Sequence, residues 1–150
     1  MSKVIISGIR TCNMREPVTL EIEKFISEIG NVSEIVTGGS TGIETIAKEY
    51  AGEMKIKSKE ILPDWEADLN AAGMIRDSKL ADYGSHLLVL SDNVSKGCNN
   101  LILEAERNNL FIKIVNLFPV SGSASGTGGR EDTHQRTSHL QYLSTSIRRV

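Results

Sequence analysis

The sequence predicts an α/β fold of the Rossmann-like kind: a three-layer sandwich with a mostly parallel central sheet flanked by helices. Two observations predict it. Strand-like and helix-like runs alternate along the first 118 residues with short connections between them, which is the pattern of parallel strands joined by helices. The run SHLLVLS at 85–91 is almost continuously apolar, as in a strand buried on both faces.

The expected elements follow one another in a regular order. Strands are expected at 3–7, 33–37, 57–63, 85–91 and 111–118, and helices at 17–30, 41–54, 72–84 and 99–109. Pro17 suits the start of the first helix and Gly30 its end, and apolar residues recur between them at helical spacing. The third strand is the most polar, which is typical of a sheet edge.

Length and composition narrow the class of protein. A chain of 150 residues is enough for one self-sufficient core, and the net charge of −2 argues against a general nucleic-acid coat. Residues 1–119 carry 13 Lys and Arg against 17 Asp and Glu. We therefore expect no nucleic-acid partner, and any anionic ligand must be bound by a local group of donors.

The cysteines and the N-terminus predict a cytoplasmic protein without a membrane partner. Cys12 and Cys98 form neither a CxxC pair nor a disulfide framework, and no metal or cofactor is expected. The N-terminal apolar run is too short for a signal peptide, and no run reaches membrane-spanning length.

A change in composition divides the chain in two. VSGSASGTGG at 120–129 consists almost entirely of small residues and resembles a flexible linker. We therefore expect a folded domain at 1–119, followed by a disordered tail at 120–150 that could derive from an expression vector.

The turn at 38–42, GGSTG, follows the second strand and precedes a helix. Glycines let the backbone approach a ligand, and the first amides of a helix point N–H groups at an anion. A phosphate could therefore bind at Gly38, Gly39, Ser40, Thr41 and Gly42. The alternative is an ordinary turn in which Ser40 or Thr41 caps the helix.

A second polar loop follows the fourth strand. It offers Asp92, Ser95, Gly97 and Asn99 as donors or helix caps, and it could be either a second phosphate cradle or an ordinary capped loop. Ends of parallel strands share one edge of a sheet, where ligands bind near the point at which strand order reverses. Gly8 and Arg10 follow the first strand to the same edge.

Three further residues are candidates on chemical grounds. Arg76 offers a fork of donors suited to phosphate, although the apolar pattern of its helix predicts an exposed face for it. Trp65 could stack on a base while Asp64 accepts ribose hydroxyls, or Trp65 could be a packing residue.

Taken in order, these segments resemble the SLOG superfamily, named for the SMF/DprA and LOG proteins, and most closely its small YspA and YpsA-like branch. The resemblance spans about residues 3–118 and rests on five segments, SGIRT, VTGGSTGIETIAKEYA, PDW, AAGMIRDSKLADYG and LSDNVSKGCNNLILEA. Departures from the branch pattern include Glu44 for an aspartate, Asp77 for an asparagine and Cys98 for a threonine.

The resemblance implies a pocket for a nucleotide-derived small molecule, such as an ADP-ribose-like or cyclic nucleotide signal. It also implies a homo-oligomer and a role as a sensor or a sequestering sponge, with defence or counter-defence as its setting. Phosphates would bind the two loops, Arg10 and Arg76 would neutralise them, and Asp64 or Glu44 would accept ribose hydroxyls.

An enzymatic function is the alternative hypothesis to ligand binding. The LOG members remove a base from nucleoside monophosphates, with a double-glycine loop that this chain lacks at 92–98. Under that hypothesis the chain is a phosphoribohydrolase, and Glu44 or Glu104 acts together with Arg76. Because no catalytic carboxylate is evident, no catalytic residue is assigned.

Overall fold

The computed structural model describes residues 2–92 and 96–117. Five parallel strands form one sheet in the order β3-β2-β1-β4-β5. The strands are β1 (Ser2–Gly8), β2 (Val32–Thr37), β3 (Lys57–Glu60), β4 (His86–Ser91) and β5 (Phe111–Asn116). The predicted Rossmann-like α/β fold is confirmed.

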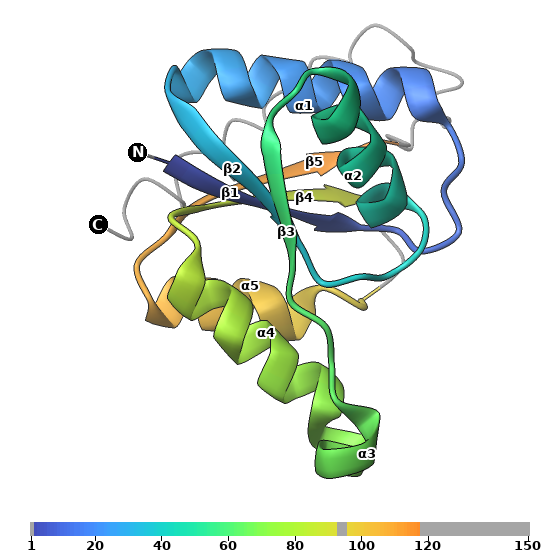
Figure 1. Cartoon of the computed structure of the whole chain (residues 1–150), viewed down its shortest axis with the longest axis vertical. Coiled ribbons are helices and arrows are strands. Elements are labelled where there is room, and N and C mark those ends of the chain that lie inside the picture. The colour runs from blue at the N-terminus through green and yellow to red at the C-terminus, as the bar shows by residue number, and fades with distance from the viewer. Residues whose placement is uncertain (1, 93–95, 118–150) are drawn as a thin grey trace, which may run out of the picture.

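Helices cover both faces of this sheet. These are α1 (Arg15–Ile29), α2 (Ile43–Glu53), α4 (Ala72–Tyr83) and α5 (Asn99–Arg107), while the short α3 (Trp65–Asp68) and the 3₁₀ turn η1 (Leu69–Ala71) precede α4. Figure 1 shows α1 and α2 on one face and α4 and α5 on the other. The short α3 and η1 elements were not predicted.

The core is divided by the sheet into two layers because side chains alternate along each strand. On β1, Val4 and Ile6 pack toward α1 and α2, whereas Ile5 packs toward α4 and α5. The central strands β1 and β4 are buried on both faces, as the apolar run at 85–91 predicts.

The polar third strand lies at the sheet edge, as predicted. All four residues of β3 are exposed, and within residues 2–92 and 96–117 it pairs with β2 alone. Lys57 and Lys59 are typical of an edge strand, because a charged side chain disfavours pairing of that strand with a strand of another chain.

The predicted boundary between a domain at 1–119 and a tail at 120–150 lies outside the described residues and stays a prediction. Among the described residues, no helix combines the length and the apolar character needed to cross a bilayer. The same part of the chain contains no group of three or more His, Cys, Asp or Glu side chains placed to hold a metal ion.

Candidate functional site

A cavity of about 720 Å³ lies at the carboxyl ends of β1 and β4. The strand order runs from β1 to β2 and β3 in one direction and from β1 to β4 and β5 in the other. The two connections leaving this point diverge, which leaves a crevice between them. The strand order therefore explains where the cavity lies.

The structure brings together residues from four of the predicted segments. The predicted site residues that line the cavity are Gly8, Arg10, Ser40, Glu44, Arg76, Gly97 and Asn99. Those described residues that do not line it are Gly38, Gly39, Thr41, Gly42, Asp64, Trp65 and Asp92. Ser95 lies outside the described residues.

The Glu44 carboxylate occupies the amides of the glycine turn. Its Oε1 accepts the backbone N–H groups of Gly38 and Ser40, each at 2.9 Å, and its Oε2 accepts the Ser7 hydroxyl at 2.8 Å. Glu44 is only 5% exposed, so these three bonds compensate a buried charge. Two N–H groups of the proposed phosphate cradle are thus already bonded to the protein itself.

Two glycines allow the chain to close around this turn. A Cβ on Gly42, where φ is +75°, would collide with the carbonyl oxygen of Ile9, and a Cβ on Gly8 would collide with that of Leu90. The Thr41 hydroxyl donates to the Arg10 carbonyl at 2.9 Å. The turn therefore packs directly against the loop that follows β1.

The structure places Arg76 differently from the sequence prediction, which put it on the exposed face of its helix. Arg76 is 9% exposed, whereas its neighbours Met74 and Ile75 are 60% and 36% exposed. The buried face of α4 repeats every four residues through Ala72, Arg76 and Leu80. The prediction was wrong because it assigned the buried face of α4 from its apolar residues alone.

Several neighbours hold the Arg76 guanidinium at the cavity wall. Its Nη1 donates to the Gly38 carbonyl at 2.7 Å, and its Nε donates to Asp77 Oδ1 at 2.9 Å. Asp77 Oδ2 in turn accepts the Asn100 side-chain amide at 3.0 Å. Because Arg76 has five N–H donors, other donors remain for a ligand.

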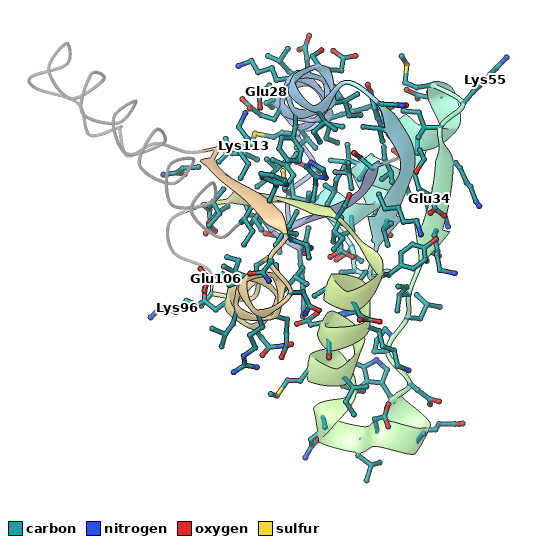
Figure 2. The ribbon with its side chains drawn as sticks, turned by 90° about the vertical axis from the view of Figure 1, so that its left-hand side faces the viewer. Glu28, Glu34, Lys55, Lys96, Glu106 and Lys113 are labelled. Atoms are coloured by element: carbon teal, nitrogen blue, oxygen red, sulfur yellow. The ribbon has the colours of Figure 1, made fainter. Side chains whose placement is uncertain are left out.

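The exposed charge at the cavity is positive. The lining acids are Glu44 and Asp77, and each is bonded to donors of the protein. By contrast, Arg10 and Lys96 are exposed, and neither makes an ion pair within the described part of the chain. Figure 2 shows Lys96 beside α5, on the opposite side of the molecule from Glu34 and Lys55.

Asp64 and Trp65 lie outside the cavity, on an arm formed by residues 61–75. The Asp64 carboxylate accepts the backbone N–H of Ala67 at 3.0 Å and so caps α3, and Trp65 is 60% exposed. Figure 1 shows α3 projecting from the body of the molecule. Within one chain, then, neither of these residues lines the cavity where a base or ribose would bind.

Sequence reasoning missed several lining residues, among them Ser7, Asp77, Lys96 and Cys98. The Cys98 Sγ lies 3.5 Å from the Ser7 Oγ, and burial raises the pKa of the Cys98 thiol. Ser7 is the last residue but one of the buried strand β1. Its position just before the loop that contains Arg10 was the signal that could have identified it. Glu104 does not line the cavity, and its carboxylate pairs with Arg107 at 3.0 Å.

Comparisons with known proteins agree with this fold. Residues 2–67 match the family model described as YAcAr, the YspA, cpYpsA-related SLOG family. The resemblance to the SLOG superfamily is confirmed. A comparison with curated proteins finds no significant match.

Two solved structures share the SLOG-type fold. The structural genomics target TM1055 is 21% identical over 89% of this chain and 80% of that chain, with a TM-score of 0.55. DNA processing protein A from Helicobacter pylori, which binds single-stranded DNA, is 15% identical over 94% of this chain and 81% of that chain, with a TM-score of 0.57. Likeness at this identity shows the fold alone.

Proposed function

We propose that the cavity binds a nucleotide-derived small molecule, an ADP-ribose-like or cyclic nucleotide signal, as a sensor or a sequestering protein. The observation that supports this most directly is the charge of the cavity. Its acids are bonded internally, whereas Arg10 and Lys96 are left exposed beside the buried Arg76. A phosphate-bearing ligand would neutralise this excess.

The phosphate site that the contacts favour is the loop leading into α5. This helix runs for nine residues, and its N-cap residue Cys98 makes no side-chain capping bond. The Asn99 N–H already donates to the Lys96 carbonyl at 3.1 Å, so the N–H groups that follow it in the first turn are the ones that suit an anion. Arg10, Lys96 and Asn99 line the cavity, whereas Glu44 holds the Gly38 and Ser40 amides.

Glu44 keeps a role for a ligand hydroxyl in this proposal. A carboxylate accepts about four hydrogen bonds, and three are accounted for here. Because Glu44 lines the cavity, its remaining acceptor position suits a ribose hydroxyl. This arrangement gives the ligand a phosphate end near α5 and a hydroxyl end near Glu44.

A phosphoribohydrolase activity is the competing function. Glu44 lines the cavity with Arg76, which keeps this candidate open, but Glu104 lies outside it. The glutamate that remains is fixed by three donors, an arrangement that suits support of the site better than proton transfer. The binding function is therefore the one that we favour.

The experiment that tests the proposal combines thermal shift with ligand recovery. The full chain is screened against ADP-ribose, its cyclic isomers, NAD, cyclic dinucleotides, nucleoside monophosphates and a single-stranded oligonucleotide. A ligand at 100 times its Kd should stabilise the fold by about 2.7 kcal/mol. Mass analysis of the recovered ligand then separates the two functions.

Each outcome has a distinct meaning. A nucleotide that raises Tm and returns unchanged supports binding, whereas release of free base establishes the enzyme instead. Stabilisation by the oligonucleotide alone, with a steep salt dependence, would mean that the cavity proposal is wrong and that the chain binds nucleic acid. The cytoplasmic location stays a prediction.

A further inference from the structure

An arm of the chain exposes a group of large apolar side chains. It comprises residues 61–75, with α3, η1 and the start of α4. Its exposed apolar residues are Leu62, Trp65, Leu69, Met74 and Ile75, with exposed fractions between 36% and 68%. Isolated apolar residues on a surface are ordinary, but five large ones within fifteen residues of the chain favour an interaction surface.

Specific contacts hold the arm in a fixed conformation. Asp64 caps α3, and the Trp65 ring packs over Gly73, where a Cβ would lie 4.0 Å from the ring. Leu69 adopts a positive φ of 49°, a conformation that costs a bulky residue energy. The α3 helix contacts η1 and α4, and Figure 1 shows it projecting past the sheet.

The arm and the adjacent sheet edge carry opposite charge. The arm contains the acids Asp64, Glu66 and Asp68, and residues 61–75 include no Lys or Arg. The edge strand β3 exposes Lys57 and Lys59, and Lys55 precedes it, while its one acid, Glu60, pairs with Lys48 at 3.4 Å. Lys57 Nζ lies 3.8 Å from Glu34, and Lys59 Nζ lies 5.3 Å from the Tyr83 ring centroid, so neither forms a tight pair.

We propose that the arm docks on the β3 edge of a second copy of this chain, and that the partner's arm docks reciprocally. A two-fold contact must place a surface against its own complement, and the arm and the edge strand are neighbours joined directly at residue 60. The acids of each arm then face the lysines of the partner's edge. The apolar side chains are then buried, and the β3 edge of each copy is covered.

The test is the mass of the full chain in solution, measured by light scattering and sedimentation over a wide concentration range. The protein should be dimeric, and Trp65→Ala should raise the dimer dissociation constant by about 30-fold or more, as expected for a central aromatic residue. Leu20→Ala, at an apolar residue of α1 that is 51% exposed, should leave it unchanged. A melting curve checks that each variant is folded.

Charge exchange separates the proposed pairing from any other dimer. Lys59→Glu and Glu66→Lys should each weaken the dimer, and the double variant should restore it. A chain that is monomeric throughout overturns the proposal, as does a dimer that Trp65→Ala leaves intact. A monomer that pellets with anionic lipid vesicles through Trp65 would also overturn it, because the arm would then face a membrane. None of these outcomes depends on the nucleotide ligand.

Discussion

The Arg76 guanidinium lies where a side chain of residue 38 would begin. A Cβ built on Gly38 would meet Arg76 Nη1 at 2.6 Å, and the same nitrogen donates to the Gly38 carbonyl at 2.7 Å. Gly38 is therefore required as the seat of a buried arginine. This explains a glycine of the turn without any contact to a ligand.

Gly38→Ala should displace Arg76 and destabilise the fold by about 1–3 kcal/mol, the usual cost of adding a methyl group to a packed site. Ligand affinity should fall as well, because the cavity loses its positioned arginine. Gly52→Ala is the matched control, since nothing lies within 4 Å of a Cβ there. The measurements are urea unfolding and titration with the nucleotide found in the screen. Equal stability of the two variants would contradict this account.

Glu44→Ala should lower the free energy of unfolding by roughly 2–4 kcal/mol, because it leaves the buried donors of Gly38 and Ser7 and the part-buried N–H of Ser40 without their acceptor. Glu49→Ala, on the same helix, removes only an exposed pair with Arg15 and should change stability by less than about 1 kcal/mol. Chemical denaturation of both variants measures the difference. Comparable losses would show that the Glu44 bonds contribute little.

Arg10→Ala should weaken binding of a phosphate-bearing ligand by about tenfold or more, since a hydrogen bond to a charged group is worth ~1.5–3 kcal/mol. The fold should tolerate the change because the Arg10 side chain is exposed. Arg107→Ala removes an exposed arginine of α5 that pairs with Glu104 outside the cavity. Isothermal titration compares the two, and an equal effect of both would argue for a diffuse surface charge instead of a site.

Stability should depend on pH through His86. This side chain stacks on Phe111 at 5.2 Å between ring centroids, and burial lowers the pKa of His86 below its ordinary value of 6.5. The unfolded chain therefore takes up a proton at a higher pH than the folded chain does. The contribution of His86 is complete above pH 6.5 and is lost as pH falls from there through the lowered pKa.

The measurement is Tm between pH 7.5 and 5.0 for the wild type and for His86→Gln. The wild type should lose more stability on acidification than the variant, which has no imidazole at this position. Parallel curves would assign the acid sensitivity to other groups.

Much of the fold could be predicted because each element carries its own periodic signal. The apolar run of β4, the polar edge strand β3 and the glycine that ends α1 all lie where the pattern predicts them. The arm did not follow from the pattern, because α3 and η1 are each four residues or fewer and have no period to detect. The prediction that Arg76 lies on the exposed face of α4 was wrong, because the polar Arg76 and Asp77 are buried as a hydrogen-bonded pair.

The sequence predicted where the residues of the candidate site lie better than it predicted what each residue does there. Parallel strands bring their carboxyl ends to one edge, so the loops containing Gly8, Ser40 and Gly97 could be assigned to one rim. Some of the hydrogen bonds that hold these residues join positions distant in the sequence. The bond between Ser7 and Glu44 joins positions 37 residues apart, and the bond between Arg76 and Gly38 joins positions 38 apart.

The sequence by itself determined the alternation of strands and helices, the edge position of β3, the SLOG resemblance and the rim where a ligand would bind. Only the tertiary structure decided that Glu44 holds the amides of the glycine turn, that Arg76 is buried, and that Trp65 projects on an arm. The physical reason is that local pattern specifies which backbone an element adopts. Ser7 meets Glu44, and Arg76 meets Gly38, only when elements distant in the sequence pack together.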